Sequence, residues 1–160
     1  MRACGVELKG SEAVICLLTL DEGAYNVPEC RQRSFTVSAS QATESIRDFH
    51  FAFSKLMEDY AVDEVVIIQR EQKGKHAGTA ASFKLEAALQ LLEIPVSLIS
   101  ASDMKTLIKR NPLQAEMDDL GLKKFQYQAF KAAYAYHNFV IYGLEEDADE
   151  EEFGGDFNEE

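Results

Sequence analysis

The sequence has few cysteines and no long apolar run. Its three cysteines, Cys4, Cys16 and Cys30, form neither a CxxC pair nor another metal-ligand spacing, which indicates reduced thiols rather than a disulfide framework. No stretch approaches the roughly 18 consecutive apolar residues of a membrane span, and the N-terminus lacks the basic and apolar regions of a secretory signal. We therefore expect a cytoplasmic protein without a membrane span.

The motifs of several common enzyme classes are also missing. The glycine spacing matches neither the Walker A loop nor the dinucleotide-binding fingerprint, and no serine or cysteine stands in a nucleophile motif. His50 and His137 have no partner at metal-ligand spacing, so we expect surface or packing roles for them. The sequence contains no internal repeat.

The net charge of −12 over 160 residues is unevenly distributed. Residues 145–160 hold ten acids and no base, whereas the rest of the chain has 16 basic and 18 acidic residues. A near-neutral body permits a local basic face that binds nucleic acid. We predict one domain over residues 1–140 and an acidic, disordered tail over 141–160. The tail either raises solubility, or mimics nucleic acid, or recruits a basic partner.

Hydrophobic periodicity predicts the order of the secondary-structure elements. Alternating and continuous apolar runs predict strands, and three- and four-residue spacing predicts helices. The predicted strands are 1–9, 12–21, 33–38, 63–69 and 95–99, and the predicted helices are 41–61, 80–92, 103–109 and 122–138. Ser38–Gln41 and Ser102 are the expected helix caps. A turn at Gly10-Ser11 joins the first two strands.

This order predicts an α/β fold with a mixed five-stranded sheet. A three-stranded antiparallel meander is followed by parallel strands, and helices cover both faces of the sheet. It is the element order of the ribonuclease-H-like fold.

Glu7 is the charge that most needs an explanation in the first strand. Strand interiors disfavour Glu, and a carboxylate on a central strand is costly unless it is hydrogen-bonded, paired or bound to a metal. Either Glu7 points to solvent at the end of an alternating strand, or it belongs to a functional site.

The segment Gly5-Val6-Glu7-Leu8-Lys9-Gly10 resembles the first-strand motif of the RuvC-type Holliday-junction resolvases, within the ribonuclease-H-like superfamily, with Glu in place of Asp. Glu71, after the fourth predicted strand, resembles their second acidic residue. The stretch from Pro95 to Lys105 resembles their fifth strand and the basic segment after it. The resemblance covers roughly residues 3–136. The chain also resembles a small bacterial family catalogued only as a domain of unknown function.

The resemblance implies a nuclease site with Mg²⁺ or Mn²⁺. Nucleases of this fold hold two divalent ions between carboxylates, and the ions activate water and stabilise the leaving oxygen. Glu7 and Glu71 would supply two of the carboxylate ligands if both side chains face the same end of the sheet. Gln128 completes the implied catalytic set, because it stands where the family has an essential Asp. Its amide oxygen carries no charge, which weakens metal binding.

The helix 122–138 allows a second alignment. It then matches the family's penultimate helix, whose lysines face the DNA, and the acidic closing helix is missing. In both alignments the chain lacks the third carboxylate of the family's metal site. Glu116, Asp118 and Asp119 either replace it or form a solvated turn before the helix.

Four basic residues are candidates for binding phosphate or nucleic acid. Lys73, Lys75 and His76 precede a predicted helix start, where backbone donors and the helix dipole favour anions. Lys105 lies in the segment that resembles the resolvases' basic one. The alternative for residues 73–76 is a flexible basic loop. The aromatic stripe of helix 122–138 either packs in the core or stacks on bases.

Three functions are compatible with these features. The first is a metal-dependent nuclease of the resolvase type that acts on structured DNA or RNA, and the resemblance implies a homodimer. The second is a non-catalytic nucleic-acid-binding or protein-interaction module that keeps the fold without the chemistry. The third, a phosphotransferase-like relative, lacks the expected second half that cradles a nucleotide.

Overall fold

A computed structural model describes residues 1–143; most of the predicted acidic tail lies outside the described residues. In chain order the elements are β1 (Arg2–Lys9), β2 (Glu12–Asp21), β3 (Ala24–Asn26), β4 (Ser34–Thr36), α1 (Thr43–Asp59), β5 (Glu64–Ile68), α2 (Ala80–Gln90), β6 (Val96–Ile99), α3 (Ala101–Arg110) and α4 (Tyr127–Tyr142), with short 3-10 helices at Met117–Leu120 and Lys124–Gln126. None of the described helices combines the length and the apolar character that crossing a bilayer requires.

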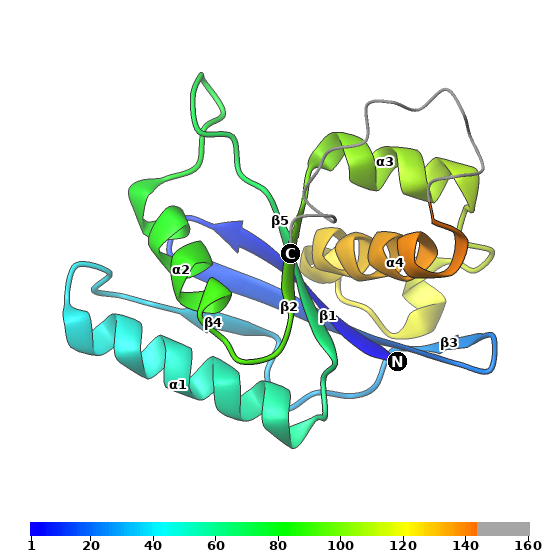
Figure 1. Cartoon of the computed structure of the whole chain (residues 1–160), viewed down its shortest axis with the longest axis horizontal. Coiled ribbons are helices and arrows are strands. Elements are labelled where there is room, and N and C mark those ends of the chain that lie inside the picture. Colours follow the sequence, from blue (N-terminus) through cyan, green and yellow to red (C-terminus); the bar gives the residue numbers. More distant parts are fainter. Residues whose placement is uncertain (144–160) are drawn as a thin grey trace.

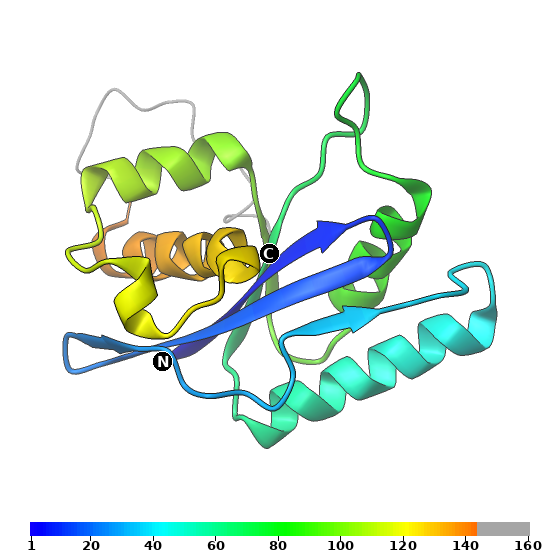
Figure 2. The same cartoon turned by 180° about the vertical axis from the view of Figure 1, so that it is seen from behind.

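The strands form one mixed sheet between two helical layers. Its order is β3-β2-β1-β5-β6, and β4 pairs with β2. The strand β2 pairs antiparallel with β1, β3 and β4, and β5 pairs parallel with β1 and β6. The helices α1 and α2 cover one face, and α3 and α4 cover the other (Figures 1 and 2). The predicted ribonuclease-H-like fold is confirmed.

The strand β3 is a sixth strand that the sequence did not indicate. It extends the β2 hairpin beyond a turn at Glu22 and Gly23, both with positive φ. Only Tyr25 among its three residues is half-buried. In a segment this short, with one inward side chain, apolar and polar residues do not alternate over enough positions to predict a strand.

Two of the helix caps differ from the prediction. The helix α1 follows Ala42 and has no side-chain cap, and α3 is capped by Ser100, whose hydroxyl accepts a hydrogen bond from the Asp103 N–H at 3.0 Å. Ser102 lies inside the first turn of α3. An N-cap residue has an extended backbone, which Ser100 adopts where β6 ends.

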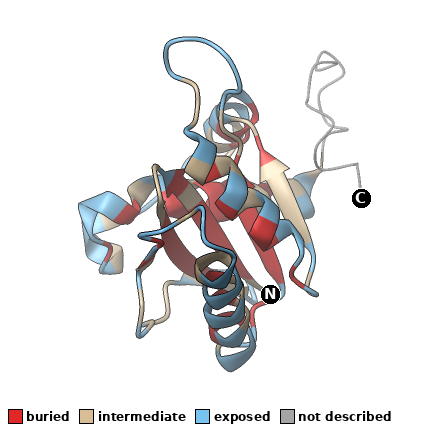
Figure 3. Ribbon diagram, turned by 90° about the vertical axis from the view of Figure 1, so that its left-hand side faces the viewer, coloured by how far each residue is buried: buried red, intermediate tan, exposed pale blue. Residues whose placement is uncertain are grey.

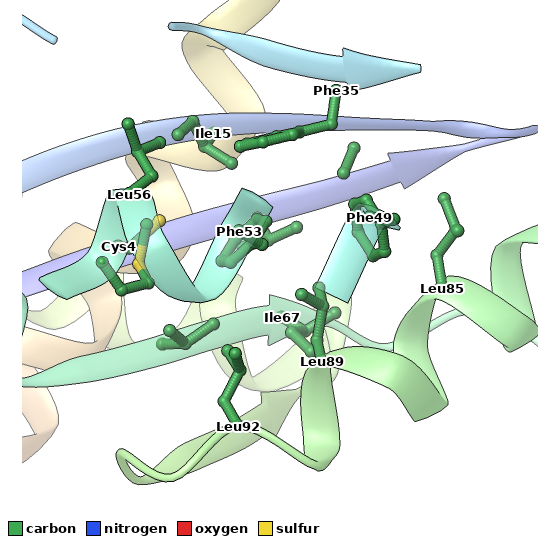
Figure 4. Packing of buried hydrophobic residues seen from close by; sticks show 14 of the residues in the cluster. Cys4, Ile15, Phe35, Phe49, Phe53, Leu56, Ile67, Leu85, Leu89 and Leu92 are labelled. Carbon is green, nitrogen blue, oxygen red and sulfur yellow. The ribbon is translucent and has the colours of Figure 1, made fainter. Parts of the chain in front are cut away.

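The alternation of β1 divides its side chains between two cores. Cys4, Val6 and Leu8 pack against α1 and α2, where residues such as Phe53 and Leu89 fill the space (Figure 4). Ala3 belongs to the second core, under α4. The central strands are buried along most of their length (Figure 3). Glu7 therefore shares the α4 face with Ala3 and Gly5, at the carboxyl end of β1.

The helix α4 lies directly on β1 at Gly5. A Cβ atom at Gly5 would overlap the carbonyl oxygen of Ala129 and would lie 2.9 Å from its carbonyl carbon and 3.0 Å from the Ala133 nitrogen. Ala129, Ala132 and Ala133 are fully buried. Only small residues permit this approach, because packed interiors leave no room for an extra methyl group.

Two side chains attach α4 to the backbone of β2. The Gln126 amide, just before α4, donates a hydrogen bond to the Ile15 carbonyl at 3.0 Å. Near the other end, the Nε2 atom of buried His137 lies 2.9 Å from the Leu18 carbonyl. His137 thus has the predicted packing role. Phe130 and Tyr134 of the aromatic stripe are buried in the core, whereas Phe125 is exposed.

We expect Gly5→Ala to lower the free energy of unfolding by about 2–3 kcal/mol, because overpacking forces the backbone of α4 away from β1. Chemical denaturation with circular dichroism measures the loss. Lys9→Ala, an exposed position of the same strand, is the control and should change stability by less than about 0.5 kcal/mol. Equal stability of the two variants would contradict the close contact.

Candidate functional site

The carboxyl ends of β1, β5 and β6 meet at one edge of the sheet. Val6 pairs with Ile67, and Ile68 pairs with Ile99. The pairing continues beyond β5, since the Gln69 N–H donates a hydrogen bond to the Ile99 carbonyl at 2.8 Å. Ligand sites of parallel α/β sheets lie outside the carboxyl ends of the strands. This edge carries Glu7 and the loop between β5 and α2.

Glu7 is half-buried at this edge. Burial raises the pKa of its carboxyl group above the usual value, and the nearby charge of Glu12 acts in the same direction. The positive charges of Lys9 and Arg70 lower that pKa, but they do not offset the burial. Glu7 is therefore a carboxylate that the fold keeps at a cost, as its place in a central strand suggested.

Glu71 follows β5, on the loop that leads to α2. Its side chain is exposed, and its charge is not among those that shift the pKa of Glu7. Its backbone carbonyl accepts a hydrogen bond from the Gly78 N–H at 2.8 Å, which closes the loop between β5 and α2. The structure thus gives the backbone of Glu71 a role in closing the loop, and the pairing of its carboxylate with Glu7 stays a prediction.

Arg70 directly precedes Glu71 in the chain, and its positive charge lowers the pKa of Glu7. Its Nε atom is buried and has no hydrogen-bond partner among the described residues. Gly78 packs against it: a Cβ atom there would lie 2.9 Å from the Arg70 Cβ and 3.2 Å from its Nε. In the sequence, Arg70 could have been found as a charged residue two positions after a buried strand. The adjacent Glu71 drew the prediction instead, because it matches the acidic residue of the resolvase motif.

Gln128 is exposed on the first turn of α4, beside Ala129, which contacts β1. Before the helix, Asp118 accepts a hydrogen bond from the Tyr127 hydroxyl, and Glu116 and Asp119 are exposed. Asp118 therefore stabilises the turn that precedes α4.

The predicted basic residues fall on two elements. Lys73, Lys75 and His76 are exposed on the loop between β5 and α2, which projects away from the rest of the molecule (Figure 1). Lys105 is exposed on α3. The side chain of Thr79 caps α2 by accepting a hydrogen bond from the Ser82 N–H at 3.1 Å. The structure brings the three loop residues together and keeps Lys105 on a separate helix.

A groove of about 590 Å³ lies between α1 and α2, on the face of the sheet away from Glu7. Arg47, His50 and Lys84 are among the residues that line it, and none of its lining residues carries a carboxylate. The groove therefore lacks the ligand type that a divalent metal prefers.

Comparison with known proteins places this fold and leaves the activity open. A family model described as "Protein of unknown function (DUF3010)" matches residues 1–136. The chain belongs to this family. No curated protein matches it.

The solved structures that resemble the chain include Holliday junction resolvases. RuvC of Thermus thermophilus has a TM-score of 0.70 at 12% identity, covering 89% of this chain and 97% of that one. The same protein in complex with a Holliday junction substrate has a TM-score of 0.69 at 12% identity, with coverages of 89% and 96%. The yeast mitochondrial Holliday junction resolvase Ydc2 has a TM-score of 0.52 at 12% identity, with coverages of 87% and 80%. These likenesses show a RuvC-like fold.

The residues of this family member do not fit the two-metal centre that the resemblance implies. Within residues 1–143, no group of three or more His, Cys, Asp or Glu side chains lies close enough together to hold a metal ion. The charges that act on Glu7 are those of Lys9, Arg70 and Glu12, which are two cations and one carboxylate. Two divalent ions need several oxygen ligands with negative charge, and a neighbouring cation opposes them.

We expect Glu7→Gln to raise the midpoint of thermal unfolding at pH 7, because the amide avoids the desolvation that raises the pKa of Glu7. A carboxyl group whose pKa is higher in the folded state binds its proton more readily there. The native chain therefore loses stability as the pH rises from the unfolded-state value of 4.5 through the folded-state pKa. The difference between the variant and the native chain should be largest at pH 7 and vanish below pH 4.5.

Scanning calorimetry at several pH values measures this difference. Glu71→Gln is the matched control, since its carboxylate is exposed, and it should leave the midpoint unchanged. A lower midpoint for Glu7→Gln at pH 7 would mean that its attraction to Arg70 outweighs its burial.

Proposed function

We propose that this protein binds structured DNA or RNA and does not hydrolyse it by two-metal catalysis. The observation that carries the proposal is that the positive charge of Arg70, rather than the negative charge of Glu71, acts on Glu7. The cationic Arg70 stands near it, and Glu71 is turned out to solvent. A guanidinium group repels divalent metal ions and attracts phosphate oxygens, so the same edge of the sheet favours binding over hydrolysis.

The basic loop supports binding at this edge. Lys73, Lys75 and His76 are exposed on it, and contacts of such side chains with phosphate supply most of the sequence-independent affinity for nucleic acid. The fold supports a branched substrate, because a RuvC protein with this fold is known in complex with a Holliday junction substrate.

A metal-dependent nuclease is the second candidate. Glu7 itself favours it, because a half-buried carboxylate at the carboxyl end of a central strand is typical of a catalytic site. In this case Glu7, Glu71 and Gln128 would hold Mg²⁺ or Mn²⁺ after the loop between β5 and α2 had moved. Cleavage that depends on the metal and on both glutamates would favour the nuclease.

We expect the full chain to bind a fluorescent four-way DNA junction in EDTA and to leave it uncut in Mg²⁺ or Mn²⁺. Linear duplexes and structured RNA in the same assays show whether the branch or the type of nucleic acid matters. Binding is measured by fluorescence anisotropy and cleavage by denaturing electrophoresis. Metal-dependent cleavage that Glu7→Gln abolishes, or an absence of binding to every substrate, would contradict the proposal.

The double variant Lys73→Gln/Lys75→Gln should weaken binding to all substrates about equally. Its plot of log affinity against log salt concentration should be shallower by about 2, because each lost phosphate contact removes roughly 0.9 from the slope. Lys55→Gln is the matched control, since Lys55 pairs with Asp59 on α1 at 3.1 Å. An equal loss of affinity in both variants would point to net charge and not to the loop.

A homodimer and a basic partner for the acidic segment remain predictions. Light scattering of the same samples, with and without the junction, measures the number of chains in each complex.

A further inference from the structure

We infer that Arg70 binds a phosphate group of the nucleic-acid backbone at the carboxyl ends of β1 and β5. This inference rests on the proposed function and assigns a ligand group to one side chain. In nucleases of this fold, metal ions supply positive charge at this edge of the sheet. In this chain the guanidinium group of Arg70 would supply it.

The first observation is that the hydrogen-bonding capacity of Arg70 is unused. Its side chain is half-buried, and its Nε atom is buried without a hydrogen-bond partner in the described part of the chain. Arg70 takes no part in the ion pairs Arg31–Asp59 and Lys55–Asp59. A guanidinium group carries five donors, and cations that are partly removed from water are usually paired. Its donors therefore remain available to an anion.

The second observation is that neighbouring residues confine the Arg70 side chain. The backbone of Gly78 packs against it, and a Cβ atom at Gly78 would also lie 2.9 Å from the Oγ of fully buried Ser82. The Thr79 hydroxyl donates a hydrogen bond to the Gly10 carbonyl at 3.3 Å, which joins the start of α2 to the turn after β1. A confined side chain loses little entropy when it binds, which increases its affinity for a ligand.

The third observation is the charge around Arg70. Lys9 and Arg70 both act on Glu7, and the exposed Lys73 and Lys75 follow on the same loop. Guanidinium matches the geometry of phosphate with two parallel hydrogen bonds. Glu7 is the opposing charge, and it repels a phosphate. Removing its charge should therefore strengthen phosphate binding, whereas a metal centre would lose its ligand.

The test follows the Nε–Hε resonance of Arg70 in the ¹⁵N-labelled full chain. The resonance is assigned by its absence in Arg70→Gln. We expect it to shift during titration with inorganic phosphate, and to shift at lower ligand concentration with the four-way DNA junction. The Nε–Hε resonance of Arg47, in the groove between α1 and α2, should stay in place.

Affinities for the junction in EDTA provide the second readout. Arg70→Gln should weaken binding at least tenfold, Arg47→Gln should leave it unchanged, and Glu7→Gln should strengthen it two- to fivefold. Gly78→Ala keeps every charge but displaces the Arg70 side chain, so it should also weaken binding. Scanning calorimetry of each variant shows that it is folded, and the titration of the native chain does not depend on any variant.

The outcomes separate this inference from the proposed function. If the chain binds the junction but Arg70→Gln keeps full affinity and the Arg70 resonance does not move, the inference fails and the proposed function stands. If no nucleic acid binds but phosphate shifts the Arg70 resonance, the proposed function fails and Arg70 remains a phosphate site. Weaker binding by Glu7→Gln in EDTA would contradict the repulsion between Glu7 and a phosphate group and would overturn the inference.

Discussion

The contact between Gly5 and the backbone of α4 is the constraint on which the rest of this structure depends. Because β1 has no side chain at that point, the helix rests on the strand at Ala129 and Ala133. Hydrogen bonds from Gln126 and His137 to carbonyls of β2 then hold both ends of the helix over the sheet. A helix held this closely covers the central strands, and together with the strand edge it keeps the next inward side chain of β1 partly out of water. That side chain is Glu7.

The cost of burying Glu7 links the packing to the chemistry. Its raised pKa shows that the surroundings disfavour its charge, although Lys9 and Arg70 lie near it. The close packing of Gly78 confines Arg70, so the fold keeps a carboxylate and a guanidinium near one another at an edge where parallel strands end. Such a pair of opposite charges does not create the concentrated negative field that two divalent ions need.

The likeness to RuvC is a likeness of fold. A TM-score of 0.70 at 12% identity requires only that apolar alternation, helix periodicity and a few close contacts be kept, and many sequences satisfy these conditions. A metal centre depends on a handful of carboxylates at one edge, and single residues change it. In this chain, which belongs to a family of unknown function, we predict that Arg70 and Gln128 are such residues.

The sequence by itself determined the order of the elements, the RuvC-like sheet and the unusual status of Glu7, because burial patterns and the cost of a charge in a strand are local properties. It did not reveal β3, which is too short to show a period, or the cap of α3, which depends on where β6 ends. Only the tertiary structure decided which charge lies beside Glu7. Arg70 and Glu71 are adjacent in the chain, and consecutive residues of extended backbone point in opposite directions. The loop, closed by the hydrogen bond from the Gly78 N–H to the Glu71 carbonyl, leaves the charge of Arg70 acting on Glu7 and the side chain of Glu71 exposed to solvent.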